Sequence, residues 1–376
     1  MNKATLVTRI FPEGERVSEV ILEYDLEIDG TNLTPDSYKV ETKMEDMMVG
    51  RTIKKVYASA TTDLVPSTNR GKFVIIELDH RDTFAKTILF SAETFLSTRP
   101  KLNYIVTQKV AITTLEGKTI APFTIQNTDE KHLIADDFQA FMYQDEKLKV
   151  EVPYRFFIPS SSDPDKKYPL VVFLHGAGER GKDNFIQLVA NKGAVVWAQP
   201  GHQALYPSFV LAPQCPQESS WTGVLLGGEL FEPNKELLSL PSLIEGLICK
   251  YNIDSNRIYI TGLSMGGFGT WAIIRESPQL FAGAIPICGG GETKEGERIK
   301  HIPVWVFHAE DDPLVSVSFS RNLVRRLVEI GGRVKYTEFL KGYLESRGWS
   351  AHSSWIPAYE DESVINWLFE NRKTSW

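Results

Sequence analysis

Cysteine is scarce in this sequence. The 376 residues include three cysteines, Cys215, Cys249 and Cys288, an odd number at wide spacing. Neither a disulfide framework nor a zinc cluster is expected from them, because both need cysteines in closely spaced sets. A single disulfide between any two of the three stays open.

Excess positive charge and long apolar runs are also missing. The formal net charge is -7, so the basic surface typical of nucleic-acid binding is not expected. No apolar run approaches the roughly 18 residues that span a bilayer, and residues 1–10 lack the apolar core of a signal peptide. The sequence predicts a protein without a membrane span, either cytoplasmic or exported with its signal removed.

The length suits two domains, and the apolar pattern changes along it. From residue 15 to about residue 126, short alternating, β-branched segments are separated by turn residues such as Asp29-Gly30 and Glu116-Gly117. Six or seven short strands at this spacing predict an immunoglobulin-like sandwich. We place this domain at residues 1–130, with a polar linker at 127–131. It shows no grouping of serine, histidine and carboxylate, which favours a structural or docking module; glycan or polymer binding and oligomer formation are the alternatives.

The second domain is predicted at residues 136–376. Two strands at its start predict an antiparallel edge, and from residue 168 onward apolar runs alternate with helical stretches. Strands are predicted at 170–174, 209–211, 257–261, 282–287, 304–307 and 334–339, and helices at 184–191, 237–250, 270–276, 317–330 and 361–371. This order predicts an α/β fold, a mostly parallel sheet with helices on both faces. Active sites of such sheets lie beyond the carboxyl ends of the strands.

One strand end carries a nucleophile motif. The strand at 257–261 runs directly into Gly262-Leu263-Ser264-Met265-Gly266, which matches the G-x-S-x-G nucleophile elbow. The flanking glycines are needed because a Cβ there would collide with the strand or the following helix. We predict Ser264 as the nucleophile; a Gly-rich turn with an incidental serine is the alternative that a short motif leaves open.

The loop His175-Gly-Ala-Gly-Glu-Arg-Gly-Lys-Asp183 fits three motifs. As a dinucleotide-binding G-x-G-x-x-G it lacks the acid expected about 20 residues later. As a phosphate loop it fails because Asp183 stands where a serine or threonine would hold Mg²⁺. The third reading is an oxyanion loop, which predicts the backbone N–H groups of Ala177 and Met265 as the oxyanion donors. No metal or organic cofactor is expected.

A serine nucleophile needs a carboxylate that orients its histidine. In α/β-hydrolases the chain order is serine, acid, histidine. The acid is therefore expected just past the strand at 304–307, where Glu310, Asp311 and Asp312 follow one another. We predict Asp312, with Asp311 as the alternative.

Three histidines, His301, His308 and His352, lie beyond the predicted nucleophile. Only His352 also follows a plausible acid at a later strand end, so we predict it as the general base; a histidine of a surface loop is the alternative. His308 is expected to pack or form hydrogen bonds at its strand end, and His175 to do the same at the oxyanion loop.

The pocket around these residues is less clearly marked. Trp221 is a candidate wall for the acyl or alcohol group, with a core or an exposed-loop tryptophan as alternatives. Gly289 begins a run of three glycines after a predicted strand and is a second candidate border. His175 and Gly176 complete the predicted pocket.

Several ordered motifs carry a family resemblance. Together they resemble the bacterial carboxylesterases related to polyhydroxybutyrate-depolymerase-like and feruloyl esterases; the motifs are residues 167–181, residues 211–216, the elbow, residues 308–315 and His352-Ser-Ser-Trp355. The resemblance spans roughly residues 136–376 and implies an α/β-hydrolase fold with a Ser-His-Asp triad. With a β-rich module in front, the chain is similar to the two-domain thermophilic esterases, and this similarity favours export. The segment 342–351 is longer than the family leads us to expect, so the resemblance does not predict the shape of the pocket rim.

The sequence thus predicts a serine carboxylesterase that hydrolyses small-molecule esters, of short to medium acyl chains or of aryl type, through an acyl-enzyme. One alternative is a serine peptidase of the prolyl-oligopeptidase type, although the chain lacks the repeat of about 40 residues that a propeller would show. Another is a non-catalytic binding or adhesion protein. The first domain is expected to form a homo-oligomer or to restrict access to the pocket.

Overall fold

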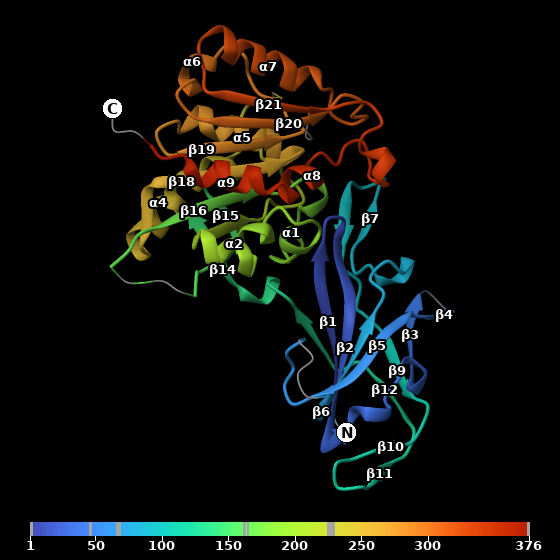
Figure 1. Ribbon diagram of the computed structural model, residues 1–376. Coiled ribbons are helices and arrows are strands. Elements are labelled where there is room, and N and C mark those ends of the chain that lie inside the picture. Colours follow the sequence, from blue (N-terminus) through green and yellow to red (C-terminus); the bar gives the residue numbers. More distant parts are fainter. Residues whose placement is uncertain are drawn as a thin grey trace. The chain divides into compact units, whose positions relative to one another are not determined.

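The computed structural model (Figure 1) describes residues 3–44, 47–64, 69–160, 163, 165–223 and 230–373. The chain divides into two compact units, one made of Met1–Leu89 and Thr98–Asp136, the other of Phe90–Ser97 and Asp137–Trp376. The second unit therefore contains a short segment from within the N-terminal part of the sequence.

The first unit is a β-sandwich. One sheet holds, in order, β13 (Asp129–His132), β1 (Lys3–Phe11), β2 (Gly14–Asp29), β6 (Arg70–Leu78) and β5 (Ile53–Ser59). The other holds β12 (Phe123–Gln126), β9 (Tyr104–Gln108), β3 (Tyr38–Met44) and β4 (Met47–Gly50), and β10 (Ile112–Thr113) pairs with β11 (Thr119–Ile120). Alternate side chains of both sheets, among them Leu22, Val40, Val74 and Val106, share one core. This confirms the predicted immunoglobulin-like sandwich.

Two strands of this unit were not predicted from the sequence. Strand β1 precedes the predicted β region, and β13 falls in the linker predicted at 127–131, so that prediction is wrong. The two strands pair in parallel, with Thr5 opposite Asp129 and Thr8 opposite His132. Because β13 is polar, the strand is held by its partner and not by an apolar pattern of its own.

The second unit contains an eight-stranded sheet. Its order is β14 (Phe138–Asp145), β15 (Val150–Phe157), β17 (Phe209–Pro213), β16 (Tyr168–Leu174), β18 (Ile253–Leu263), β19 (Gly283–Ile287), β20 (Val304–Ala309) and β21 (Val334–Phe339). Strands β14 and β15 are antiparallel at one edge, and the six strands β16 to β21 run parallel to one another. The mostly parallel sheet predicted from the alternating pattern is confirmed.

Helices cover both faces of this sheet (Figure 1). They are α1 (Ile186–Val189), α2 (Pro200–Leu205), α3 (Lys235–Leu238), α4 (Leu240–Lys250), α5 (Met265–Glu276), α6 (Gly296–Ile299), α7 (Ser318–Glu329), α8 (Trp355–Glu360) and α9 (Glu362–Glu370). Strand β16 is buried throughout: Val172 shares a core with Ile244 of α4 and Trp271 of α5, whereas the ring of Phe173 meets Tyr359 of α8. Burial on both faces explains why this strand is a continuous apolar run.

The segment Phe90–Ser97 forms most of a hairpin between β7 (Leu89–Ser91) and β8 (Leu96–Thr98). Its two phenylalanine rings, Phe90 and Phe95, meet edge to face at 6.0 Å. It lies against the loop after β16, because a Cβ on Gly178 would be 3.1 Å from Ser97 Oγ and 3.5 Å from the Phe90 ring. The hairpin therefore packs on the loop predicted to hold the oxyanion.

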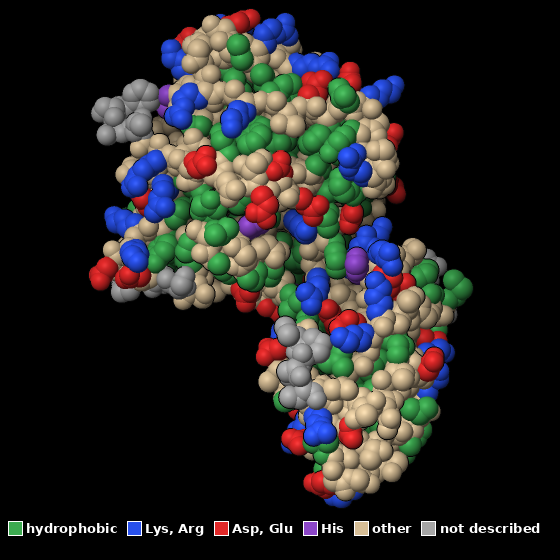
Figure 2. All heavy atoms as spheres, in the orientation of Figure 1, with side chains coloured by type: hydrophobic (Ala, Val, Ile, Leu, Met, Phe, Trp, Pro, Cys, Tyr) green, Lys and Arg blue, Asp and Glu red, His purple; other side chains and the backbone are tan. Residues whose placement is uncertain are grey.

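Acidic and basic side chains are interspersed over the face shown in Figure 2, in keeping with the small net charge. Within the residues that the structure describes, no helix is long and apolar enough to cross a bilayer. Cys215, Cys249 and Cys288 are all free thiols.

Candidate active site

Ser264 occupies a sharp turn between β18 and α5. Its backbone is in a strained conformation with φ 54° and ψ -118°, and its N–H donates to the carbonyl of Ile287 at 2.9 Å. A Cβ on Gly262 would lie 2.3 Å from the carbonyl oxygen of Gly266, and one on Gly266 would lie 2.0 Å from that of Leu174. The tight turn therefore requires both glycines, as the elbow motif demands.

The structure brings Ser264, His352 and Asp312 into one hydrogen-bonded row. His352 Nε2 lies 2.9 Å from Ser264 Oγ, and Nδ1 lies 2.7 Å from Asp312 Oδ2. An ionised carboxylate only accepts hydrogen bonds, so Nδ1 carries the proton and Nε2 accepts from the serine hydroxyl. The row is thus arranged to withdraw a proton from Ser264.

Asp312 follows β20 and is held on both oxygens. Oδ1 accepts the backbone N–H groups of Leu314 at 2.9 Å and Val315 at 3.0 Å. Burial acts to raise the pKa of Asp312, but hydrogen bonds from His308 and His352 outweigh it and hold this pKa well below its usual value. The carboxylate is therefore ionised near neutral pH.

The neighbouring acids point elsewhere. Asp311 Oδ2 accepts the N–H of Gly342 at 2.7 Å, and Glu310 accepts the N–H of Lys341 at 3.2 Å. Both carboxylates thus hold the segment that leads toward His352, whereas Asp312 alone of the three contacts this histidine.

The two predicted oxyanion donors lie on adjoining loops. Met265 is the first residue of α5, and Ala177 is the first residue of a short 3-10 helix, Ala177–Glu179. First residues of helices have backbone N–H groups that the helix itself does not use. A Cβ on Gly176 would come within 2.9 Å of the Leu263 side chain, so the loop packs against the elbow.

His175 and Trp221 lie beneath this loop and are fully buried. The Trp221 indole donates to the carbonyl of His175 at 3.0 Å, and His175 Nε2 accepts the N–H of Cys215 at 2.9 Å. Nδ1 therefore carries the proton and donates to Gly176 O at 2.6 Å. Burial lowers the pKa of His175 to about 4, which keeps it neutral near neutral pH.

Glu179 is a buried residue of the loop that sequence reasoning missed. Its Oε2 lies 3.8 Å from His175 Nδ1, and its Oε1 lies 3.4 Å from the amide of Asn191. Burial raises the pKa of Glu179 to about 7. An acid inside a Gly-rich loop after a buried strand was the available signal, but its burial depends on Asn191, which comes from elsewhere in the fold.

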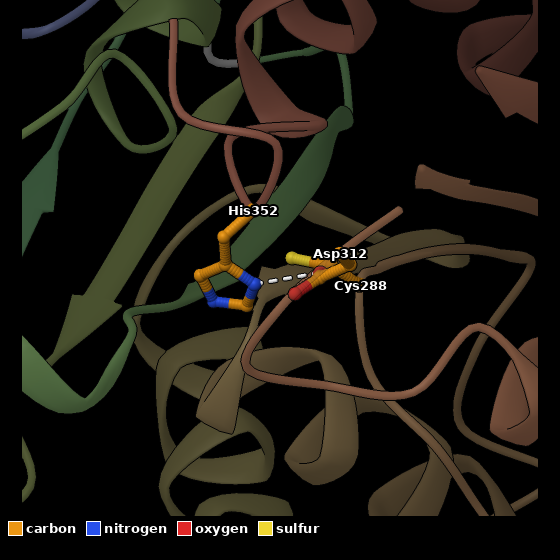
Figure 3. Close-up of side chains that lie close together, drawn as sticks. All are labelled: Cys288, Asp312 and His352. Atoms are coloured by element: carbon orange, nitrogen blue, oxygen red, sulfur yellow. Dashed lines mark hydrogen bonds and ion pairs between the residues drawn. The ribbon is translucent and has the colours of Figure 1, made fainter. Parts of the chain in front are cut away.

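Cys288 and Gly289 follow β19 and lie next to the proposed site residues. A Cβ on Gly289 would be 2.5 Å from the backbone of Gly267, which shows that these segments touch. The Cys288 thiol lies beside Asp312 and His352 (Figure 3), and one potential metal-ligand atom of each falls within 4.8 Å of the others. Burial and the charge of Asp312 raise the pKa of Cys288 well above its usual value. A protonated thiol is a poor metal ligand, and His352 Nδ1 is already occupied by its proton, so the trio fits a hydrogen-bonded site better than a metal centre.

The comparisons with known proteins agree with this architecture. The family described as the esterase Ig-like N-terminal domain matches residues 3–121. The crystal structure of a thermostable esterase matches with a TM-score of 0.97 and 55% sequence identity, over 99% of this chain and 100% of that one.

A poly(3-hydroxyalkanoate) depolymerase C from Paucimonas lemoignei is 31% identical over 128 residues, which make up 32% of this chain and 28% of the depolymerase. The chain thus matches under a third of the length of this curated relative. The match to the thermostable esterase covers both chains almost completely. The chain therefore belongs to the family of two-domain esterases, carboxylic-ester hydrolases that join an immunoglobulin-like N-terminal domain to an α/β-hydrolase domain.

Proposed function

We propose that the protein is a serine carboxylesterase whose catalytic triad is Ser264, His352 and Asp312. The observation that carries this proposal is the row of contacts from Oγ to Nε2 at 2.9 Å and from Nδ1 to Oδ2 at 2.7 Å. Its members come from three separate loops at the carboxyl ends of the parallel strands, where α/β enzymes place their sites.

In this mechanism Ser264 Oγ attacks the ester carbonyl while His352 Nε2 takes the hydroxyl proton. The N–H groups of Ala177 and Met265 stabilise the oxyanion of the tetrahedral intermediate. The intermediate collapses when His352 gives its proton to the leaving alcohol, which leaves the acyl group on Ser264. Water then attacks this ester with His352 again as base, releasing the acid and restoring the serine.

We propose short to medium acyl esters or aryl esters as substrates. Support comes from the feruloyl-esterase-like motifs of the sequence and from the partial match to a polyester depolymerase. A panel of p-nitrophenyl esters of rising chain length, with a feruloyl ester added, tests the proposal. Turnover of the p-nitrophenyl esters that peaks beyond medium acyl length, with no cleavage of the feruloyl ester, would refute it.

Two further measurements separate the alternatives. Peptide anilides in the same assay test the peptidase reading; good anilide turnover with poor ester turnover would favour it. The Ser264→Ala variant tests the nucleophile and should lose on the order of 10³-fold or more in kcat. Full activity in this variant would refute Ser264 as the nucleophile, whereas a wild-type protein that cleaves none of these substrates would favour a binding or adhesion role.

For the first unit we propose homo-oligomer formation or restriction of access to the pocket. Among the residues of this unit that the structure describes, no serine, histidine and carboxylate form a hydrogen-bonded row, which favours a non-catalytic role. The hairpin Phe90–Ser97, encoded within its sequence, lies against Gly178 of the oxyanion loop. A chain that starts near residue 136 tests both roles. An unchanged number of subunits in solution together with an unchanged ester range would refute them.

A further inference from the structure

His308 has contacts that mere packing at the end of β20 does not require. The side chain is completely buried. Its Nε2 lies 3.0 Å from the carbonyl oxygen of Val315 and 3.4 Å from Asp312 Oδ2. Its Nδ1 lies 2.7 Å from the hydroxyl of Ser320 on α7. The ring therefore links α7 to the loop that carries Asp312.

The neighbours of His308 decide where its proton lies. Nε2 faces two oxygens that only accept, the carbonyl of Val315 and the carboxylate of Asp312, so Nε2 carries a proton in every charge state of the ring. In the neutral ring, Nδ1 accepts from Ser320. Oδ2 of Asp312 thus faces two ring N–H donors, one from His308 and one from His352.

We propose that His308 is a positioning residue for ester hydrolysis, one that sets the place and the basicity of the Asp312 oxygen that orients His352. This inference rests on the triad proposed above. Asp312 Oδ2 divides its hydrogen-bonding capacity between the two imidazoles, so the Nε2–H of His308 reduces the negative charge that His352 experiences. The buried setting strengthens the effect, because a low local dielectric amplifies interactions between polar groups.

Other charged and titratable groups face this cluster. Glu338 of β21 pairs across from His308, and it is bound by Arg321 of α7 through two hydrogen bonds. The thiol of Cys288, the residue after β19, lies beside Asp312 (Figure 3). The Glu338–Arg321 pair has no net charge, and the Cys288 thiol keeps its proton. The contact between His308 Nε2 and Asp312 Oδ2 is therefore the one expected to change the basicity of Asp312.

The test compares His308→Leu with His308→Gln. Leucine removes the donor, whereas the glutamine amide can place an N–H near the position of Nε2. We expect His308→Leu to lower kcat by roughly 10- to 100-fold with little change in KM, as for other residues that orient a reacting group. We also expect the acid limb of kcat/KM to move to higher pH by about 0.5 to 1 unit, because an Asp312 oxygen relieved of one donor favours protonated His352 more strongly. His308→Gln should restore most of both.

Ser320→Ala serves as a second test variant and His202→Leu as a control. Ser320→Ala keeps the imidazole but removes its Nδ1 partner, so a smaller shift in the same direction is expected. His202→Leu removes a histidine of α2 and should leave the pH profile unchanged. Near-UV circular dichroism and Tm identify variants that fail to fold; if His308→Leu fails, the Gln and Ser320→Ala variants decide.

The inference is overturned if folded His308→Leu, or Ser320→Ala in its place, keeps the wild-type kcat and acid limb. It is also overturned if His308→Gln is as impaired as His308→Leu, since the donor would then not be what matters. Failure of the triad itself looks different, because Asp312→Asn would then stay active. An inactive Asp312→Asn beside an unaffected His308→Leu refutes this inference alone.

Discussion

The carboxyl of Glu179 faces the imidazole of His175, with Oε2 and Nδ1 3.8 Å apart. Burial lowers the pKa of the histidine to about 4 and raises that of the acid to about 7. Between these two values the pair carries no charge, so the loop that holds Ala177 has a neutral interior. Above pH 7 Glu179 ionises without a cation to pair with its charge among these contacts.

Glu179 should therefore make the hydrolase domain less stable as pH rises. The folded pKa of this acid lies above its unfolded value of 4.5, so between these values the folded state binds more protons than the unfolded state. The free energy of unfolding thus falls from about pH 4.5 to about pH 7 and then levels off, by up to about 3 kcal/mol. Glu179→Gln should lack this part of the pH dependence.

Urea unfolding at pH 5 and pH 8 measures the difference. Tryptophan fluorescence reports on the second unit alone, because all eight tryptophans lie at residue 197 or later. We expect the free energy of unfolding of the wild type to fall, relative to that of Glu179→Gln, when the pH is raised from 5 to 8. Parallel curves for the two proteins would contradict the assignment of a neutral Glu179.

Replacement of the proposed triad acid should be far more damaging than replacement of its neighbour. Asp312→Asn can no longer fix the tautomer of His352, and a loss of about 10⁴-fold in kcat is expected. Asp311→Asn is the matched control; it disturbs the hydrogen bond to Gly342 and should stay within about tenfold of wild type. Steady-state kinetics on a p-nitrophenyl ester checks both. The reverse ranking would make Asp311 the acid.

The elbow should not tolerate a methyl group at Gly266. A Cβ there would lie 2.0 Å from the carbonyl of Leu174, and we expect Gly266→Ala to destabilise the domain by about 3 kcal/mol or more. Gly246→Ala in α4 is the control, because its Cβ meets nothing within 4 Å. That change should stabilise by about 0.5 to 1 kcal/mol. Thermal unfolding of both variants tests these opposite effects on stability. Equal Tm values for the two variants would contradict the steric requirement for glycine at position 266.

The three thiols should differ in reactivity. Cys249 is exposed, whereas Cys215 and Cys288 are buried, and burial raises the pKa of both buried thiols. An aromatic disulfide reagent should therefore label one thiol in the native protein and three in denaturant. Cys249→Ser should abolish the native labelling; persistent rapid labelling would show that a second thiol is accessible.

The features that could be predicted from the sequence are those marked by residues close together in the chain. The elbow is defined within five residues, and buried parallel strands such as β16 appear as continuous apolar runs. The order of serine, acid and histidine then narrows the candidate acid to Glu310, Asp311 and Asp312 and the candidate histidine to His352, because each follows a strand end.

The features that stayed hidden depend on partners distant in the sequence. Strand β13 is polar and exists through its pairing with β1, so no pattern in its own residues reveals it. The protonated carboxyl of Glu179 requires burial beside His175 and Asn191, and the contact of His308 with Asp312 requires the turn that brings Val315 back. Spacing along the chain does not encode these distances.

The hairpin Phe90–Ser97 has a consequence for the evolution of this family. The chain leaves the first unit, supplies this hairpin to the second, returns, and leaves again near Asp136. Recombination at a single junction near residue 136 would bring a hydrolase domain together with a foreign hairpin on its oxyanion loop. The two halves of the gene are therefore expected to be inherited together, and chimaeras between relatives should work best when residues 90–97 are exchanged with the hydrolase domain.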